Sequence, residues 1–331
     1  MSISPLLIVG PSWVGDMIMA QSLFRVLKVR QPDRAIDLLA PAWSLPVIER
    51  MPEVRRGIVL PLGHGELGFG KRRQLGQSLK PTAYGQAIVL PRSMKAALVP
   101  FFAGIPRRSG FRGEMRYGVI NDRRPFDKTV LNQTVKRFVA LGLEAGEALP
   151  EIPEPKLTVS ADNQERLLKA LGLTAAGGVV AMMPGAEYGP AKCWPVEYFA
   201  ELAAALNAAG KAVWVLGSAK EVALGEAIAA RSDAHNLCGR TELADVIDLL
   251  AMAQYAVSND SGLMHVAAAA GSHVIGIYGS TSPGFTPPLT SKKTLHYLDL
   301  ECSPCFQREC PLGHLRCLRE ILPAKVLAGI S

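Results

Sequence analysis

Short apolar runs alternate with helical patterns along the whole chain, and this alternation limits the fold to β–α units built around parallel sheets. Each run is only a few residues long and is followed by apolar residues at helical spacing. In the first half, the sequence predicts strands at residues 6–9, 36–39, 58–60 and 87–90. In the second half, it predicts strands at residues 179–183, 212–216, 256–258 and 274–278.

A stretch rich in Pro and Glu, EALPEIPEPKLTV at residues 147–159, separates the two series of strands. Its composition and lack of periodicity predict a linker. The length of 331 residues suits two domains, which we place at residues 1–155 and 156–331. Because open parallel sheets bind ligands at the carboxyl ends of their strands, we expect the two domains to face a shared cleft.

Basic residues are concentrated in the first half of the chain. Residues 1–155 contain 22 Lys and Arg against 13 Asp and Glu, whereas residues 156–331 contain 14 against 16. Such an excess favours an anionic partner, which is nucleic acid, a phosphorylated substrate or a membrane surface. Aromatic residues make up only 6% of the chain and no stacking motif accompanies the basic clusters, so we do not expect nucleic acid.

The chain has no apolar run near the ~18 residues that cross a bilayer. The apolar segment near the start is also too short for a secretion signal and has no basic residues before it. We therefore expect a cytoplasmic protein.

An acidic residue follows the first strand in LLIVGPSWVGDMIMAQSLF, residues 6–24. Apolar residues recur at helical spacing from Ala20 to Leu27, so Asp16 opens the first helix. Most carboxylates at such positions only cap free amides and complement the helix dipole. Position alone therefore leaves two roles open for Asp16, capping or a place in a functional site.

A lysine lies between a strand and a helix in VVAMMPGAEYGPAKCWPVEYFAELAAAL, residues 179–206. Pro195 suits the first turn of that helix, which we expect to stop at Gly210. Lys192 stands just ahead of the helix, where a cation would meet an anion bound at the end of the strand. A solvated loop lysine is the alternative.

A second loop of this kind occurs in AVSNDSGLMHVAAAAGSHVIGIYGSTSPGF, residues 256–285. We predict a helix at residues 261–270, whose first amides, at Ser261 and Gly262, could hold a phosphate. A pyrophosphate could lie between these amides and Lys192, although no dinucleotide or P-loop fingerprint is present. Helix capping by Asp260 and core packing by His265 are the alternatives for those two side chains.

Four of these stretches together resemble a known family. The motifs GPSWVGDMIMAQSLF, PGAEYGPAKCWP, FTPPL and SNDSGLMHVAAAAG are similar to those of bacterial ADP-heptose:lipopolysaccharide heptosyltransferases of glycosyltransferase family 9, in collinear order over nearly the whole chain. The Trp-Val-Gly-Asp form of the first motif favours the type II enzymes over type I.

The resemblance implies a GT-B fold of two Rossmann-like domains, with the acceptor on the N-terminal domain and the nucleotide sugar on the C-terminal domain. The implied reaction transfers heptose from ADP-L-glycero-D-manno-heptose to the heptosyl-Kdo2-lipid A inner core, with inversion and without a metal or other cofactor. Asp16 would be the general base, and Lys192 with the amides at Ser261 and Gly262 would stabilise the diphosphate. The acceptor implies peripheral contact with the cytoplasmic face of the inner membrane.

The family motifs also imply further binding residues. On the donor side they are Tyr188, Ser218, Glu221, Thr241, Leu243, Asp260 and His265. On the acceptor side we choose Lys95 and Arg112 from the basic clusters, as contacts for phosphate or carboxylate groups.

A cysteine series departs from the family pattern in CSPCFQRECPLGHLRC, residues 302–317. Cys302, Cys305, Cys310 and Cys317 could bind a structural metal, form disulfides or stay as free thiols. The spacing matches no standard zinc module, so all three states stay open. Cys193 and Cys238 are expected to be ordinary packed residues.

Two other functions remain alternatives at this point. A different GT-B enzyme, such as a type I heptosyltransferase or a sugar-nucleotide epimerase, would keep the fold and the diphosphate site. A basic membrane-surface binding protein would explain the charge of the first half but not the phosphate-binding loops of the second.

Overall fold

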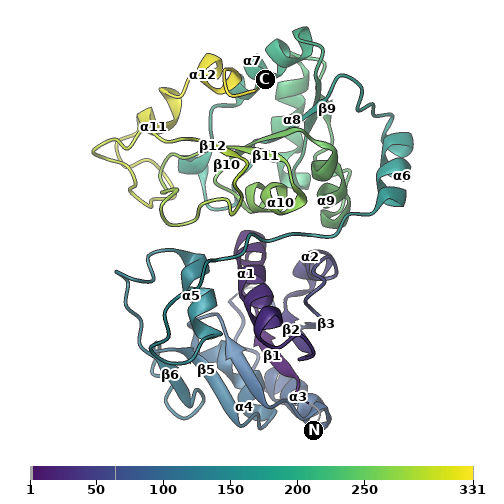
Figure 1. Cartoon of the computed structure of the whole chain (residues 1–331). Helices are drawn as coiled ribbons and strands as arrows, with labels where there is room; N and C mark the ends of the chain where they lie inside the picture. The colour runs from purple at the N-terminus through teal and green to yellow at the C-terminus, as the bar shows by residue number, and fades with distance from the viewer. Residues whose placement is uncertain (1–2, 64, 331) are drawn as a thin grey trace. The chain divides into compact units, whose positions relative to one another are not determined.

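The computed structural model describes residues 3–63 and 65–330 of the chain. The chain divides into two compact units, Met1–Pro155 and Lys156–Ser331, here called unit 1 and unit 2. Each unit contains one six-stranded parallel sheet with helices packed around it (Figure 1). The fold is therefore α/β in both units, as the alternation of strands and helices predicts.

Unit 1 is built on a sheet whose strands follow the order β3-β2-β1-β4-β5-β6. The strands are β1 (Leu6–Val9), β2 (Ile36–Ala40), β3 (Arg56–Val59), β4 (Gln86–Val89), β5 (Arg107–Phe111) and β6 (Asp122–Arg124). The helices are α1 (Val14–Arg30), α2 (Leu45–Ile48), α3 (Phe69–Leu79), α4 (Leu98–Phe102) and α5 (Thr134–Leu141), with short 3-10 turns η1 (Ala42–Ser44), η2 (Lys80–Thr82) and η3 (Met94–Ala97). The order reverses between β1 and β4, and ligands of such sheets bind at this switch point.

Unit 2 has the strand order β12-β11-β10-β7-β8-β9. Listed from β9 to β12, with β7 counted as the first strand, this is the same order as in unit 1. The strands are β7 (Val179–Met183), β8 (Ala212–Val215), β9 (His235–Asn236), β10 (Tyr255–Asn259), β11 (His273–Ile277) and β12 (Lys293–His296). The helices are α6 (Ala161–Leu171), α7 (Val196–Ala208), α8 (Val222–Ala229), α9 (Leu243–Met252), α10 (Gly262–Ala270), α11 (Arg316–Arg319) and α12 (Pro323–Leu327), with 3-10 turns η4 (Pro190–Lys192) and η5 (Ala219–Glu221). The switch point of this sheet lies between β7 and β10.

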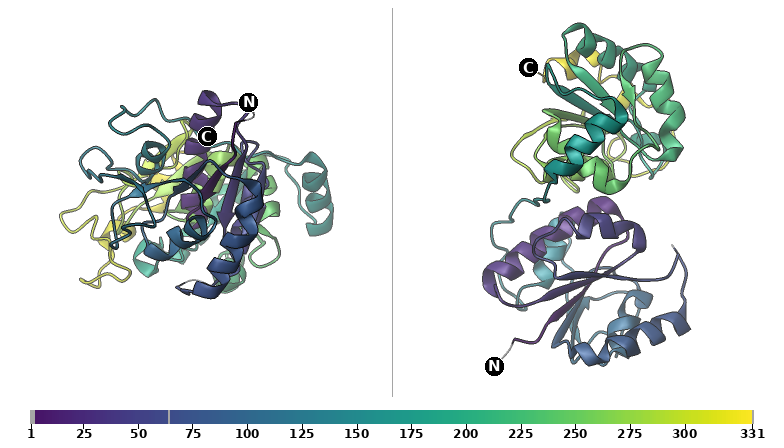
Figure 2. Two further views of the ribbon diagram at one scale, coloured as in Figure 1. Left: turned by 90° about the horizontal axis from the view of Figure 1, so that it is seen from below. Right: turned by 90° about the vertical axis from the view of Figure 1, so that its right-hand side faces the viewer.

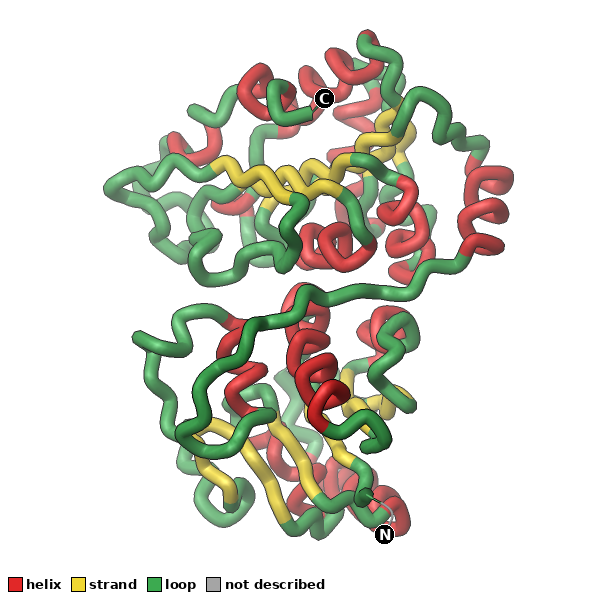
Figure 3. Tube along the Cα trace, viewed as in Figure 1, coloured by secondary structure: helices red, strands yellow, loops and turns green. Residues whose placement is uncertain are grey.

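Helices cover both faces of each sheet, with α1 on one face of the unit 1 sheet and α3 on the other (Figure 2). The chain adds β2 and β3 on one side of β1, and β4, β5 and β6 on the other. Because each crossover is right-handed, the helices of these two series lie on opposite faces of the sheet. Most of the chain between β12 and α11 is loop (Figure 3). Within the described ranges, no helix combines the length and the apolar character that a bilayer span requires.

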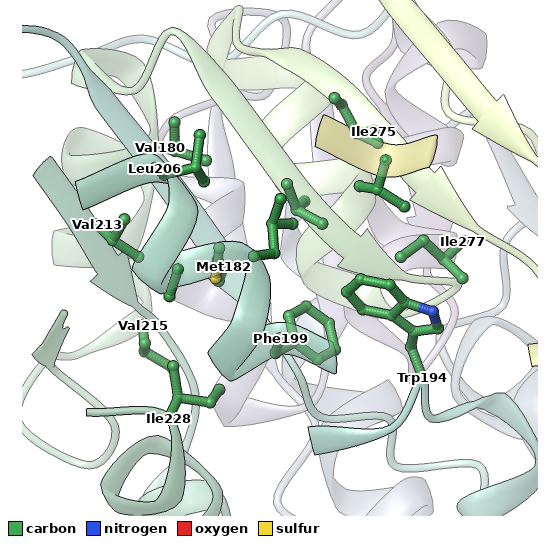
Figure 4. Close-up of a cluster of buried hydrophobic side chains, with 14 of the residues drawn as sticks. Val180, Met182, Trp194, Phe199, Leu206, Val213, Val215, Ile228, Ile275 and Ile277 are labelled. Carbon is green, nitrogen blue, oxygen red and sulfur yellow. The ribbon is translucent and has the colours of Figure 1, made fainter. Parts of the chain in front are cut away.

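The core of unit 2 anchors one end of the loop that carries Lys192. Trp194 and Phe199 lie in this core beside Val215 and Ile277, and both rings are buried (Figure 4). Burial of an aromatic side chain contributes about 2–3 kcal/mol. The position two residues after Lys192 is therefore fixed by packing.

All eight predicted strands are present, with ends that differ by at most two residues from the prediction. The prediction missed β5, β6, β9 and β12. Pro195 is not in the first turn of α7: it is the N-cap residue, and the helix begins at Val196. Its ring still suits this position because an N-cap backbone N–H needs no helical partner.

Candidate active site

Lys192 and Asp260 form an ion pair at the switch point of unit 2. Lys192 ends η4 in the loop after β7, Asp260 follows β10, and these two strands are neighbours. The Lys192 Nζ lies 2.6 Å from Asp260 Oδ2 and 3.1 Å from the Asp260 carbonyl oxygen. Thr281 Oγ1 donates to the same carboxylate oxygen at 2.6 Å. Asp260, which is only 4% exposed, therefore positions the ammonium group.

The helix that follows Asp260 has a free N-terminus. Ser261 is the N-cap residue of α10, but its side chain makes no capping bond, and Gly262 is the first helical residue. The Ser280 hydroxyl, in the loop after β11, is buried and has no hydrogen-bond partner within the described parts of the chain. Free amides at a helix N-terminus bind anions through hydrogen bonds and the helix dipole. Asp260 does not cap α10, so the capping alternative is wrong for this residue.

Hydrogen bonds fix the loop that carries Lys192. The Trp194 backbone N–H donates to Asn259 Oδ1 at 2.9 Å, and Asn259 Nδ2 donates to the Pro184 carbonyl at 2.7 Å. The Trp194 indole N–H donates to the Ile321 carbonyl at 2.8 Å. Since Asn259 is fully buried, this network holds the loop in place before any ligand arrives.

The cysteine-rich segment, residues 302–317, forms hydrogen bonds with the loop that carries Lys192 and with the loop after β11. The Tyr188 hydroxyl donates to the Phe306 carbonyl at 2.6 Å, and the Ala191 N–H donates to the Arg308 carbonyl at 3.0 Å. The Phe306 N–H donates to the Ser280 carbonyl at 2.7 Å. Tyr188 also has cations near its ring, with Lys192 Nζ at 5.2 Å and the Arg308 guanidinium at 5.4 Å from the ring centre. Sequence reasoning missed Arg308 because nothing in the segment's own pattern shows that it meets the Tyr188 loop.

Ser218 and Glu221 pair with each other at the start of η5. Glu221 Oε2 accepts from the Ser218 N–H at 2.7 Å and from its hydroxyl at 2.5 Å, so the two residues form a capping box. Glu221 also lies beside Gly185 in the loop after β7, where a Cβ atom would come within 2.6 Å of Glu221 Cγ. These predicted donor residues therefore adjoin the Lys192 loop.

Thr241 and Leu243 lie at the start of α9. Leu243 is the first residue of the helix, and the Thr241 hydroxyl is buried without a hydrogen-bond partner among residues 3–63 and 65–330. Such a hydroxyl is available to a ligand.

His265 lies in the second turn of α10 and is 4% exposed. Burial is the main cause that lowers the pKa of His265 to about 4. The charge of Asp260 raises this pKa, and the charge of Lys192 lowers it. The imidazole is therefore neutral near pH 7, and its burial agrees with the packing alternative.

All six cysteines are free thiols. In the described residues, no group of three or more His, Cys, Asp or Glu side chains is placed to hold a metal ion. Hydrogen bonds from four backbone amides lower the pKa of the Cys310 thiol, and the bond from Leu315 has the largest effect. Burial, together with the neighbouring cysteines, raises the pKa of Cys317 to about 11. Burial also raises the pKa of Cys193 and Cys238, as expected for packed thiols.

The predicted residues of unit 1 lie at one edge of its sheet. Asp16 follows β1 in the first turn of α1, Lys95 follows β4 in η3, and Arg112 follows β5 directly. Because β1, β4 and β5 are consecutive parallel strands, these residues all lie at the carboxyl edge. The Met94 N–H donates to Glu114 Oε2 at 2.7 Å and joins the Lys95 and Arg112 loops.

Two arginines stack on one phenylalanine near Asp16. The guanidinium groups of Arg92 and Arg137 lie 4.4 and 5.0 Å from the centre of the Phe126 ring. Burial and the charge of Arg92 lower the pKa of Arg137, whereas the charge of Asp16 raises it. Asp16 therefore lies close enough to Arg137 for the two charges to interact.

A cavity of about 140 Å³ lies beside Arg112. Arg116 and Arg123 also line it, together with Glu114 and Tyr117. Arg116 is 3% exposed, and its Nε has no hydrogen-bond partner in the described chain. Three arginines therefore line the cavity, of which the sequence predicted only Arg112 as a binding residue.

Comparison with known proteins decides the family. The model of glycosyltransferase family 9 (heptosyltransferase) matches residues 72–316, which is most of the chain. The chain belongs to glycosyltransferase family 9. This heptosyltransferase chain is 44% identical to lipopolysaccharide heptosyltransferase 2 of Salmonella typhimurium, over 97% of the chain and 96% of that protein. It is 43% identical to lipopolysaccharide heptosyltransferase 2 of Escherichia coli, over 98% of the chain and 97% of the relative.

The solved structure of E. coli ADP-heptose lps heptosyltransferase II matches the heptosyltransferase chain with a TM-score of 0.88. The identity is 41%, and the match covers 98% of this chain and 97% of that one. The predicted GT-B fold and the predicted family are therefore confirmed. As a member of family 9 with relatives of type 2, the chain is a glycosyltransferase enzyme of lipopolysaccharide biosynthesis.

Proposed function

We propose that the enzyme transfers L-glycero-D-manno-heptose from ADP-heptose to the first heptose of the Kdo2-lipid A inner core. The observation that carries this proposal is the convergence of the Lys192 ammonium and the free N-terminus of α10 at the switch point of unit 2. A diphosphate is the anion that suits one ammonium group and adjacent backbone amides. The 44% identity to a lipopolysaccharide heptosyltransferase 2 supports heptose as the transferred sugar.

In the proposed donor site, Lys192 and the amides at Ser261 and Gly262 bind the diphosphate. These groups stabilise the charge that grows on ADP as the C1–O bond to the phosphate breaks. The site thus supplies by itself the positive charge for which other glycosyltransferases use a divalent metal. Ser218, Glu221, Thr241 and Leu243 would contact the nucleoside, and Tyr188 would contact the donor from the loop that carries Lys192.

In the proposed reaction, Asp16 is the general base. The acceptor hydroxyl attacks C1 from the face opposite ADP, so that a new O–C1 bond forms, ADP leaves with the electron pair, and Asp16 takes the hydroxyl proton. Arg137 supports this role because its positive charge interacts with the Asp16 carboxylate.

The acceptor binds unit 1 in this proposal. The cavity lined by Arg112, Arg116 and Arg123 would receive a phosphate or carboxylate group of the acceptor, because arginine side chains suit either anion. Lys95, which follows β4 at the same edge of the sheet, would contact a second anionic group. Since this acceptor is anchored in lipid, we place the enzyme at the cytoplasmic face of the inner membrane.

Deletion of the gene tests the proposed function. We expect mass spectrometry of the mutant lipopolysaccharide to show a core truncated after one heptose, and complementation to restore full length. Purified enzyme should transfer sugar from ADP-heptose and not from UDP-GlcNAc or GDP-mannose. A core of normal length in the mutant would exclude the proposal, and epimerisation of a nucleotide sugar without acceptor would favour the other GT-B function.

A further inference from the structure

Unit 1 exposes a continuous group of apolar side chains where α3 meets α4. Leu67, Phe69 and Phe101 are 58%, 54% and 41% exposed. The Phe69 and Phe101 rings each contact Phe102 edge to face, with centroid distances of 5.2 and 5.5 Å. Exposed apolar side chains that adjoin one another mark an interaction surface more often than scattered ones do.

The loop that presents Leu67 and Phe69 is held in place by a hydrogen bond from the Arg72 side chain and by the packing of Gly68. Arg72 is buried, and its Nε donates to the Leu67 carbonyl at 2.6 Å. Gly68 has a left-handed φ of 53°, and a Cβ atom there would come within 2.2 Å of the Leu62 side chain. The chain therefore packs Gly68 inward against Leu62 and leaves the two apolar side chains outside.

Cations adjoin the same apolar group. Arg73 lies four residues after Phe69 on α3 and so shares its helix face. Lys71 lies on the other side of the helix, and its Nζ is 3.4 Å from Glu66 Oε1. The Arg108 guanidinium lies 5.6 Å from the centre of the Phe101 ring. We call these six residues the aromatic–basic face, which comprises Leu67, Phe69, Arg73, Phe101, Phe102 and Arg108.

We propose that the aromatic–basic face docks the enzyme on an anionic phospholipid bilayer. Aromatic and leucine side chains enter the boundary between headgroups and acyl chains, while neighbouring cations meet the lipid phosphates. The charge of the face is complementary to that of such a membrane, and unit 1 carries the basic excess of the whole chain. The choice of partner rests on the proposed function, because that acceptor lies in a membrane.

Vesicle sedimentation with the full chain tests this proposal without donor or acceptor. We expect wild-type protein to bind vesicles of equal parts phosphatidylethanolamine and phosphatidylglycerol, and to bind pure phosphatidylcholine weakly. The double variant Phe69→Ser/Phe101→Ser should lose about tenfold or more of its affinity for the anionic vesicles. Arg73→Glu should also weaken binding to the anionic vesicles, with a loss that shrinks at high salt.

The matched control is Val29→Ser/Val130→Ser, which removes two exposed apolar side chains of unit 1 outside the face. It should bind vesicles like the wild type, and circular dichroism should show the same unfolding temperature for all variants. The Phe69→Ser/Phe101→Ser variant should keep its turnover with a water-soluble, deacylated acceptor. Absence of wild-type binding to anionic vesicles, an equal loss in the control, or a change of oligomeric state in place of lost binding would each overturn the proposal. Failure of the proposed reaction would leave the vesicle result unchanged.

Discussion

Replacement of Asp16 by Asn is expected to lower the turnover of ADP-heptose with acceptor by about 10²–10⁴, or roughly 3–5 kcal/mol in activation free energy. Asn keeps the size and hydrogen-bonding capacity of the side chain but cannot accept the proton of the attacking hydroxyl. The affinity for ADP should stay unchanged because the proposed nucleotide site lies in unit 2. Steady-state kinetics and ADP titration of the same preparation measure both effects.

The alternative role of Asp16, stabilisation of the N-terminus of α1, predicts a different result. Loss of a carboxylate from a first helical turn costs about 0.3–1 kcal/mol of stability and does not affect the chemical step. Asp33→Asn changes an exposed carboxylate beyond the other end of α1 and serves as the control. If folded Asp16→Asn protein turned over at nearly the wild-type rate, Asp16 would not be the base.

Replacement of Lys192 by Met is expected to have the second large effect. We predict a loss of about 10²–10³ in kcat/KM for ADP-heptose, because the charge opposite the leaving diphosphate is gone. The same change leaves the buried Asp260 carboxylate without its cation and should cost about 3 kcal/mol of folding stability. Kinetics and urea unfolding report the two losses separately.

A double variant separates these two roles of Lys192. In Lys192→Met/Asp260→Asn the buried charge is removed together with its partner, so most of the stability should return. ADP affinity should stay low, because the ammonium group is still absent. Lys169→Met, an exposed change on α6, is the matched control. Recovery of ADP affinity in the double variant would show that stability, and not charge, explains the single variant.

The central strands of both sheets could be predicted from the sequence, whereas several strands near the edges could not. Leu6–Val9 and Val179–Met183 are buried throughout, and continuous apolar runs of this kind are typical of central parallel strands. The missed strand β6 (Asp122–Arg124) consists only of charged residues at the sheet edge. Asp122 accepts from Ser109 Oγ at 2.7 Å and Arg107 Nε at 3.1 Å, so polar contacts between side chains help to hold this edge. No hydrophobic period predicts such a strand.

The same distinction applies to the site. The sequence placed Lys192 and Asp260 on separate loops, but their ion pair depends on the pairing of β7 with β10, which are far apart in the chain. The bond from Thr281 to Asp260 likewise depends on the strand order, because Thr281 follows β11, the neighbour of β10. Arg116 differs, because only the path of the loop after β5 shows that its guanidinium is buried at a cavity. Contacts within one βα unit were predictable, and those between units of the sheet were not.

The central claim is that a sugar diphosphate is held by Lys192 and the first amides of α10. A crystal structure with bound ADP tests it most directly. We predict a phosphate oxygen within hydrogen-bond distance of Lys192 Nζ and another at the Gly262 N–H. ADP bound away from both groups would contradict the account.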